Sequence, residues 1–130
     1  MANRRMFSKS VTDTDLFHSM PLSAQALYFH LGIAADDDGF VGNPISITRS
    51  IGADATDIRT LAENGYLIQM ERGIYLITDW HINNHIRKDR YQHSVYKELL
   101  RMVTQDRSKR YVLGQPTDIP VVDPDKDSTD

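Results

Sequence analysis

The pattern of apolar and polar residues from 43 to 54 predicts a short helix followed by a tight turn. Pro44 suits the first turn of a helix, where a backbone N–H has no partner inside the helix and can be absent. One face of this helix is apolar and consists of Ile45, Ile47 and Ile51. Residues 51–54 form the predicted turn, and Asp54 is placed to cap a second helix through its carboxylate.

The second helix is predicted to end at Asn64-Gly65, where a left-handed residue is easily accommodated. Its apolar residues repeat at helical spacing and are Ile58, Leu61 and Ala62. Two β-rich runs follow, at residues 66–70 and 74–78, and Glu71-Arg72-Gly73 joins them as a three-residue hairpin connection. A helix-turn-helix followed by a hairpin is the order of a winged-helix domain. We therefore predict a mostly α fold with a small β-hairpin wing, that is, an α+β winged helix-turn-helix.

The residues before this motif predict two further helices and a very short strand. Thr12-x-x-Asp15 has the form of a capping box and is expected to open a short helix. Ser23 is expected to cap a longer helix that runs to about Ala35 and is the most buried element. Phe40-Val41 is expected to form a short strand that pairs with the wing. The predicted apolar face of the longer helix consists of Ala24, Leu27, Tyr28, Leu31 and Ala34, broadened by Phe29 and Ile33.

The residues after the wing predict an anchor and one last helix. Trp80 is expected to attach the chain to the core through its large apolar ring. A helix over about 94–103 would place Val95, Leu99 and Met102 on one face, widened by Tyr96, Leu100 and Val103. A helix this apolar must pack on the core or on another subunit. We therefore expect a homo-dimer or higher oligomer, formed through this helix or through the N-terminal arm.

Three parts of the chain follow from these patterns. Residues 1–11 form a basic N-terminal arm, and residues 12–112 form the winged-helix domain with its C-terminal helix. Residues 113–130 are acidic and contain prolines, so they bury too little apolar surface to fold and are expected to be a linker or disordered tail.

Composition narrows the class of protein only slightly. The 130 residues are enough for one domain with a modest core, and 40% of them are hydrophobic. The absence of cysteine excludes disulfides and thiolate metal sites and fits a reducing cytosol. No segment resembles a signal peptide, and no apolar run approaches the roughly 20 residues needed to span a bilayer. We expect a soluble, cytoplasmic protein in a bacterial host cell, without a membrane partner.

The formal net charge of −3 hides an uneven distribution along the chain. Residues 13–79 hold ten acidic and three basic side chains, whereas residues 80–112 hold eight basic and three acidic ones. The first twelve residues contain Arg4, Arg5 and Lys9 and no acid. The location of the cations matters more for a polyanionic partner than the net charge does. The cations therefore flank the helix-turn-helix rather than lying within it.

The sequence contains little support for catalysis or for a cofactor. His81 and His85 are spaced for chelation on a helix, but no further ligand lies at a usual spacing, so a metal site is not expected. Asp36-Asp37-Asp38-Gly39 lacks the alternating ligands of a calcium loop and is interpreted as a turn with solvated carboxylates. The chain has neither a phosphate-binding glycine loop nor a nucleophile elbow. We predict no enzymatic activity, no cofactor and no metal.

The candidate DNA contacts lie on the second helix and on the basic flanks. Thr56, Arg59 and Thr60 are candidates for contacts with base edges or phosphates in a major groove. The alternative is a solvated helix face, which Asp57 and Glu63 favour because phosphates repel both. The remaining candidates are the arm residues Arg4, Arg5 and Lys9, Arg72 at the wing tip, and the cluster Arg87, Lys88 and Arg90, with Tyr91 available to stack or to bind phosphate.

Four stretches of the chain carry a resemblance to a known family. They are Arg5-Met6-Phe7-Ser8-Lys9, residues 20–31, residues 35–41 and Lys88-Asp89-Arg90-Tyr91. With these stretches the chain resembles the N-terminal domain of phage and prophage replisome organizers of Gram-positive bacteria, also described as DnaD-like replication initiators. The resemblance implies a winged-helix domain that binds double-stranded DNA at a replication origin. It also implies a linker, which begins where this chain stops, and a C-terminal domain that recruits the replicative helicase or its loader.

Two other functions remain open from the sequence. The excess of acidic residues over 13–79 disfavours approach of that surface to DNA and favours a winged-helix scaffold for oligomerisation or helicase loading. The fold alone equally allows a transcriptional repressor.

Overall fold

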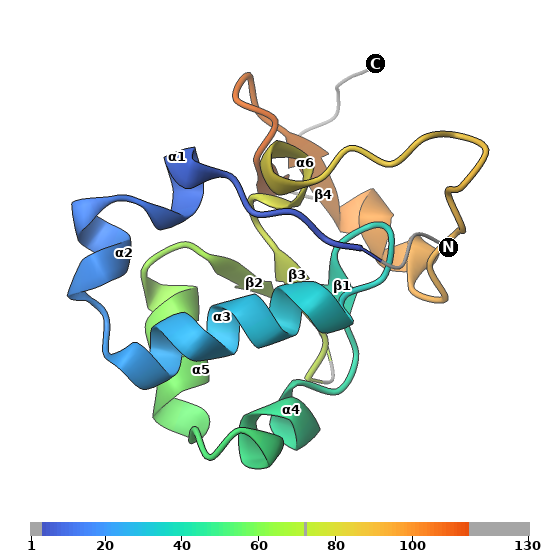
Figure 1. Ribbon diagram of the computed structural model, residues 1–130. Helices are drawn as coiled ribbons and strands as arrows, with labels where there is room; N and C mark the ends of the chain where they lie inside the picture. Colours follow the sequence, from blue (N-terminus) through green and yellow to red (C-terminus); the bar gives the residue numbers. More distant parts are fainter. Residues whose placement is uncertain (1–3, 72, 115–130) are drawn as a thin grey trace.

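Two short helices and a hairpin occupy residues 44–77, in the order that the hydrophobic pattern predicts. The computed structural model describes residues 4–71 and 73–114, which form a small α+β domain (Figure 1). Its helices are α1 (Lys9–Thr12), α2 (Asp15–Ser19), α3 (Leu22–Ala34), α4 (Pro44–Ser50), α5 (Ala55–Glu63), α6 (Trp80–Asn83) and the 3-10 helix η1 (Lys97–Met102). Its strands are β1 (Phe40–Val41), β2 (Leu67–Gln69), β3 (Tyr75–Ile77), β4 (Val103–Gln105) and β5 (Tyr111–Leu113).

Local signals set the limits of α4 and α5 as predicted. Pro44 is the first residue of α4, and Gly52 adopts a positive φ of 78° in the turn that follows. Asp54 caps α5 by accepting a hydrogen bond from the Thr56 N–H at 2.8 Å. The Asp57 carboxylate accepts from the Asp54 N–H in return, which completes a capping box that was not predicted. The chain leaves α5 through Gly65, whose φ is 87°.

The predicted hairpin and the predicted short strand form one antiparallel sheet in the order β1-β3-β2. Phe40 is opposite Leu76 and Val41 is opposite Tyr75, so β1 pairs with the second strand of the hairpin. The connection between β2 and β3 therefore lies at the Val41 end of β1. The loop that precedes β1 lies at the other end, where the Ile77 N–H donates to the Gly39 carbonyl.

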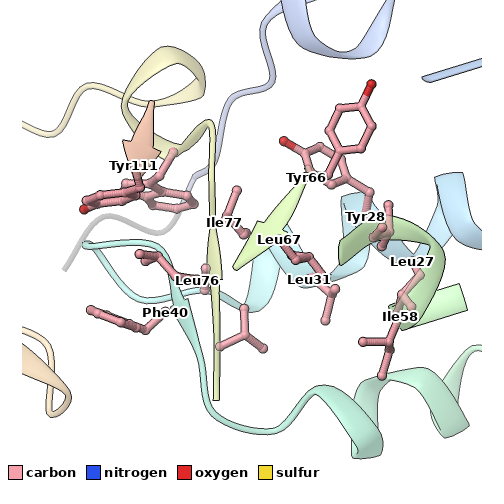
Figure 2. Close-up of a cluster of buried hydrophobic side chains, with 14 of the residues drawn as sticks. Leu27, Tyr28, Leu31, Phe40, Ile58, Tyr66, Leu67, Leu76, Ile77 and Tyr111 are labelled. Atoms are coloured by element: carbon pink, nitrogen blue, oxygen red, sulfur yellow. The ribbon is translucent and has the colours of Figure 1, made fainter. Parts of the chain in front are cut away.

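The core lies where α3 and α5 pack on this sheet. In Figure 2, Leu27 of α3 lies near Ile58 of α5, Leu31 lies near Leu67 of β2, and the Tyr28 ring extends towards Tyr66. Strand residues Leu67, Leu76 and Ile77 are buried in the same cluster, and Phe40 and Tyr111 extend it. The predicted apolar face of α3 is correct for its first four residues, but Ala34 and Ile33 are exposed. Trp80 is buried, as expected for an anchor.

The N-terminal segment, predicted to be a basic arm, packs onto the domain from Arg5 onward. The Phe7 ring packs edge-on against the rings of Tyr28 and Phe29, with centroids 6.0 and 5.0 Å away. The Ser8 N–H donates to Asn83 Oδ1 at 2.8 Å, and Ser8 caps α1. Regular structure therefore begins at Lys9, before the predicted boundary at residue 12. In Figure 1 this segment, in dark blue, crosses the molecule above α3.

Two predicted helix caps are wrong. Thr14, not Thr12, caps α2 by accepting from the Phe17 N–H at 3.1 Å. Ser23 lies inside the first turn of α3, and its hydroxyl donates to the Asp57 carboxylate at 2.8 Å. Ser23 therefore joins α3 to α5 instead of capping α3.

The predicted last helix is also wrong. The chain forms the 3-10 helix η1 and then an antiparallel hairpin, β4 and β5, which pairs Val103 with Leu113. Leu99 and Val103 are buried, but Val95 is 87% exposed and Met102 is exposed, so the predicted single apolar face does not exist. Asp106 accepts hydrogen bonds from the N–H groups of Ser108 and Arg110, which stabilises the hairpin turn. Leu113, the first residue of the predicted tail 113–130, is therefore part of β5, and the tail from residue 115 onward lies outside the described residues.

Within the part of the chain that the structure describes, no helix has the length and apolar character needed to cross a membrane.

Candidate nucleic-acid interface

The outward face of α5 presents fewer acidic groups than the sequence suggests. Thr56 and Arg59 are exposed and Thr60 is half-buried, at positions that share one face of the helix. The Thr56 hydroxyl donates to Asp54 and the Thr60 hydroxyl donates to the Thr56 carbonyl, so Arg59 supplies the free donors of this face. Asp57 is only 6% exposed, because its carboxylate is turned inward to the Asp54 N–H and the Ser23 hydroxyl. The Asp57 carboxylate is therefore buried and is not part of the exposed face of α5 that a ligand would contact. Glu63 and the capping Asp54 remain exposed.

The surface next to α5 includes a hollow between α4 and the hairpin turn. Its volume is about 520 Å³, and it is lined by Gly42, Asn43, Pro44, Ile45, Ser46, Arg49, Ser50 and Gly73. Ile45, which belongs to the predicted apolar face of this helix, is 49% exposed. The buried residues of α4 are instead Pro44 and Thr48, whose hydroxyl donates to the Pro44 carbonyl at 2.7 Å. Arg72, the predicted wing-tip contact, lies outside the described residues.

The three predicted arm residues have different environments. Arg4 and Lys9 are exposed. The Arg5 side chain is 3% exposed and forms an ion pair with Asp37 at 3.1 Å. Its guanidinium also donates to the Ala35 carbonyl at 2.7 Å and lies over the Trp80 ring, 5.1 Å from the centroid. The Arg5 side chain is therefore buried and paired inside the domain and is not among the exposed cations, unlike those of the other two arm residues.

The loop of residues 36–38 is an internal hydrogen-bond acceptor and not the solvated turn that was predicted. Asp37 and Asp38 are buried, and Asp36 accepts from the N–H groups of Asp38 and Phe40 at 3.0 Å. Backbone carbonyls of the loop accept from Trp80 Nε1 and from the Tyr111 hydroxyl, both at 2.9 Å. We call residues 36–38 the acidic loop. Burial raises the pKa of Asp38 above its ordinary value, although hydrogen bonds from Tyr91 and Ser94 oppose this shift.

The acidic loop holds the end of a second loop, residues 85–93, which we call the basic loop. The Tyr91 hydroxyl lies 2.8 Å from both carboxylate oxygens of Asp38, and the Gln92 N–H donates to Asp37 at 3.0 Å. Ser94, which directly follows the loop, donates to Asp38 through its N–H and to Asp36 through its hydroxyl. Burial and the Asp38 carboxylate raise the pKa of Tyr91, so its hydroxyl stays protonated and donates. This hydroxyl is therefore not available to bind phosphate as predicted.

The predicted basic cluster is exposed within the basic loop. Arg87, Lys88 and Arg90 all face solvent, and Arg87 pairs with Asp89 at 3.2 Å. The hairpin turn between β4 and β5 adds Arg107 and Lys109, which are also exposed and which the sequence analysis did not single out. These two segments are neighbours, because residues of both line one pocket of about 260 Å³: Asp37, Asp38, Trp80, His81, Asn84, His85, Ile86, Tyr91, Gln105 and Lys109.

The basic loop and α5 do not form one surface. The basic loop is attached to the acidic loop, which lies at the end of β1 opposite to the connection between β2 and β3. In Figure 1 the basic loop, in yellow, is at the upper right, whereas α5 is on the left. The expectation that the cluster lies beside the wing is therefore not met. The predicted contacts divide into an α5 surface and a separate basic-loop surface.

The two histidines considered for metal binding have separate roles. His81 lies in α6, and its Nε2 is 2.9 Å from the Tyr111 hydroxyl. His85 lies beyond the end of this helix and is exposed. Burial lowers the pKa of His81, although the charge of Asp38 opposes the shift. Among the described residues, no three side chains of histidine, cysteine, aspartate or glutamate are grouped to hold a metal ion.

Comparisons of the chain with models of protein families, with curated proteins and with solved structures found no match.

Proposed function

We propose that this chain is a winged-helix domain that binds double-stranded DNA, with α5 as the helix that enters the major groove. The order of α3, β1, α4, α5 and the β2–β3 hairpin, together with the sheet order β1-β3-β2, supports this assignment. The observation that carries it is the inward orientation of Asp57, which leaves Thr56, Arg59 and Thr60 on the outer face of α5. Arginine and threonine at such positions can contact base edges and phosphates.

The biological role that we propose is replication initiation at a phage-type origin. It rests on the resemblance of the sequence to replisome organizers. The same resemblance implies a partnership with the replicative helicase or its loader, which we include in the proposal. A transcriptional repressor is the alternative within the same DNA-binding fold.

The scaffold alternative loses part of its motivation in the structure. It rested on the acidic charge of residues 13–79, which would repel DNA. The acidic loop, Asp57 and Asp79 are all turned to partners inside the domain, and Asp79 accepts from Arg110 at 2.7 Å. Asp37 and Asp79 are paired with Arg5 and Arg110, so these two charges are compensated locally. Asp38 and Asp57 are buried and accept hydrogen bonds from neutral donors, so they are not exposed to an approaching polyanion. We keep self-association as a proposal, and light scattering over a concentration series tests it: a strictly monomeric protein would exclude it.

Binding to a labelled origin duplex, measured by fluorescence anisotropy over a range of salt concentrations, tests DNA binding. We expect affinity to fall linearly with salt on logarithmic axes, because each neutralised phosphate releases counterions. Absence of binding at low salt would reject the proposal. Genome-wide footprinting separates the two roles: sites repeated within a replication gene favour an initiator, and sites at promoters favour a repressor.

A substitution in α5 tests the recognition helix itself. Arg59→Ala should reduce discrimination between the preferred duplex and a scrambled one by about 1–3 kcal/mol, the value of one good base contact. Arg49→Ala removes an exposed cation from α4 and serves as the matched control for charge. Equal losses on both duplexes for Arg59→Ala would show that this arginine contacts only the backbone.

A further inference from the structure

We propose that Asp38 and Tyr91 are positioning residues that hold the basic loop in the conformation that contacts the DNA backbone. The inference rests on the proposed DNA-binding function. It gives a role to the acidic loop, whose negative charge would by itself oppose DNA binding. Asp38 does not touch DNA in this proposal. It acts through Tyr91 and through the loop that Tyr91 ends.

Both ends of the basic loop are fixed to the domain. At its start, Asn84 is buried, and its Oδ1 accepts from the Met6 N–H at 2.8 Å. At its end, the Tyr91 hydroxyl, the Gln92 N–H and both donors of Ser94 bind the three carboxylates of the acidic loop. Between these two attachments lie the exposed cations Arg87, Lys88 and Arg90. The cations are thus carried on a short segment whose two ends cannot move independently of the core.

The acidic loop is itself held from several sides, so it is a rigid support. Arg5 pairs with Asp37, Trp80 Nε1 donates to the Asp37 carbonyl, and the Tyr111 hydroxyl donates to the Asp38 carbonyl. A loop that is already ordered loses less conformational freedom when it meets a ligand than a free loop does. Holding the cations in place therefore raises their contribution to the binding free energy. The same arrangement places the carboxylates of the acidic loop near the DNA, and their charge opposes binding.

The opposing effects of charge and position make the proposal testable. If Asp38 acted on DNA only through its charge, removing that charge would strengthen binding. If Asp38 positions the basic loop, its removal weakens binding. We therefore expect Asp38→Asn to bind the origin duplex more weakly than the wild type does. Tighter binding by this variant, with its fold retained by circular dichroism, would contradict the positioning role.

Tyr91→Phe is the cleaner variant, because it deletes only the hydroxyl and leaves net charge unchanged. We expect an affinity loss of about three- to tenfold near physiological salt and a smaller salt slope, by about 0.9 for each phosphate contact that the loop no longer makes. Tyr96→Phe is the matched control: Tyr96 packs on Phe40, and its hydroxyl has no hydrogen-bond partner among the described residues. It should bind like the wild type.

A second background separates positioning from general destabilisation. In a protein that already carries Arg87→Ala, Lys88→Ala and Arg90→Ala, the Tyr91→Phe change should have no further effect on affinity or salt slope. An equal loss in both backgrounds would overturn the proposal, because the hydroxyl would then act independently of the cations. Wild-type protein that binds no DNA would reject the proposed function. Wild-type binding that Tyr91→Phe leaves unchanged would reject only the positioning role.

Discussion

Individual carboxylates in this domain differ sharply in their availability. Asp57 and Asp38 are buried and accept hydrogen bonds from distant segments, whereas Glu63 is exposed on α5. A buried carboxylate with several donors stabilises the fold and presents little charge to a ligand. The same residue type therefore contributes to stability at one position and to surface potential at another.

Asp57 provides a direct test of this distinction. Asp57→Ala should lower the free energy of unfolding by about 1–2 kcal/mol, because it removes one half of the capping box and the partner of Ser23. Urea unfolding measures this change. Glu63→Ala, on the exposed side of the same helix, should be nearly neutral for stability and should strengthen DNA binding slightly. Equal stability of the two variants would contradict the assignment of Asp57.

His81 should give the stability a measurable dependence on pH. Burial lowers its pKa in the folded state, and the groups that face it are Asp38, Lys109 and Tyr111. Below the ordinary histidine value of about 6.5 the unfolded chain then binds more protons, so stability falls as pH falls towards the lowered pKa. The slope for one proton is at most about 1.4 kcal/mol per pH unit.

Replacing His81 should remove this component. In His81→Asn, the loss of unfolding free energy between pH 7 and pH 5 should be smaller than in the wild type. Urea titrations at the two pH values measure the difference. The buried Asp38, with its raised pKa, contributes in the opposite direction, with stability falling as pH rises from about 3.8. Identical pH dependence in wild type and variant would show that His81 titrates normally.

At the scale of elements, η1 is the clearest case in which packing overrides periodicity. Apolar residues at positions 95, 99 and 102 have helical spacing, but Ser94 is held by the acidic loop and Val103 is paired with β5. Only residues 95–102 remain between these two restraints, and the last six of them form a 3-10 helix. Leu99 faces the core while Val95 faces solvent.

A pair of aspartate substitutions tests this arrangement. Leu99→Asp should destabilise the domain by several kcal/mol or prevent folding, because it buries an unpaired charge. Val95→Asp should change the unfolding free energy by less than about 0.5 kcal/mol, since Val95 is exposed. Thermal unfolding followed by circular dichroism measures both. A folded, monomeric Leu99→Asp protein would instead indicate that Leu99 lies at a subunit interface.

At the scale of the whole molecule, two surfaces of different character lie on different sides of the domain. The α5 surface combines threonines with Arg59, whereas the basic-loop surface carries several cations from two segments. The first type of surface is suited to reading sequence, and the second is suited to binding the backbone without regard to sequence. Asp37 and Asp38, beside the second surface, are buried, and the exposed cations of this surface outnumber its exposed acids Asp89 and Asp106 despite the net charge of −3.

The basic-loop surface includes Arg107 and Lys109 of the β4–β5 turn, and their removal is a further test. Arg107→Ala combined with Lys109→Ala should weaken binding to all duplexes similarly and lower the salt slope by about one to two units. Arg101→Ala is the matched control, because Arg101 is exposed on η1 and lies near Glu98 at 3.8 Å. Unchanged binding in the double variant would exclude the β4–β5 turn from the interface.

Short-range chemistry determined much of the fold from the sequence alone. Pro44, the Asp54 cap and Gly65 defined α4 and α5, because each acts on backbone groups within a few residues of itself. The hairpin and the short strand β1 were likewise predictable from β-rich runs and their turns. The exposure of Thr56, Arg59, Arg87, Lys88 and Arg90 also followed from the helical period and from loop composition.

Only the tertiary structure decided which charges remain available for binding. Arg5 and Asp37 are more than 30 positions apart in the sequence and form a buried ion pair, and Tyr91 contacts Asp38 across 53 positions. No local pattern specifies such partners, because a charged side chain has the same sequence signal whether it is solvated or paired. The β4–β5 hairpin was missed for the same reason: the interactions that end η1 come from the acidic loop and from β5. Whether a side chain is buried depends on which distant segments pack against it, and these contacts form only in the folded domain.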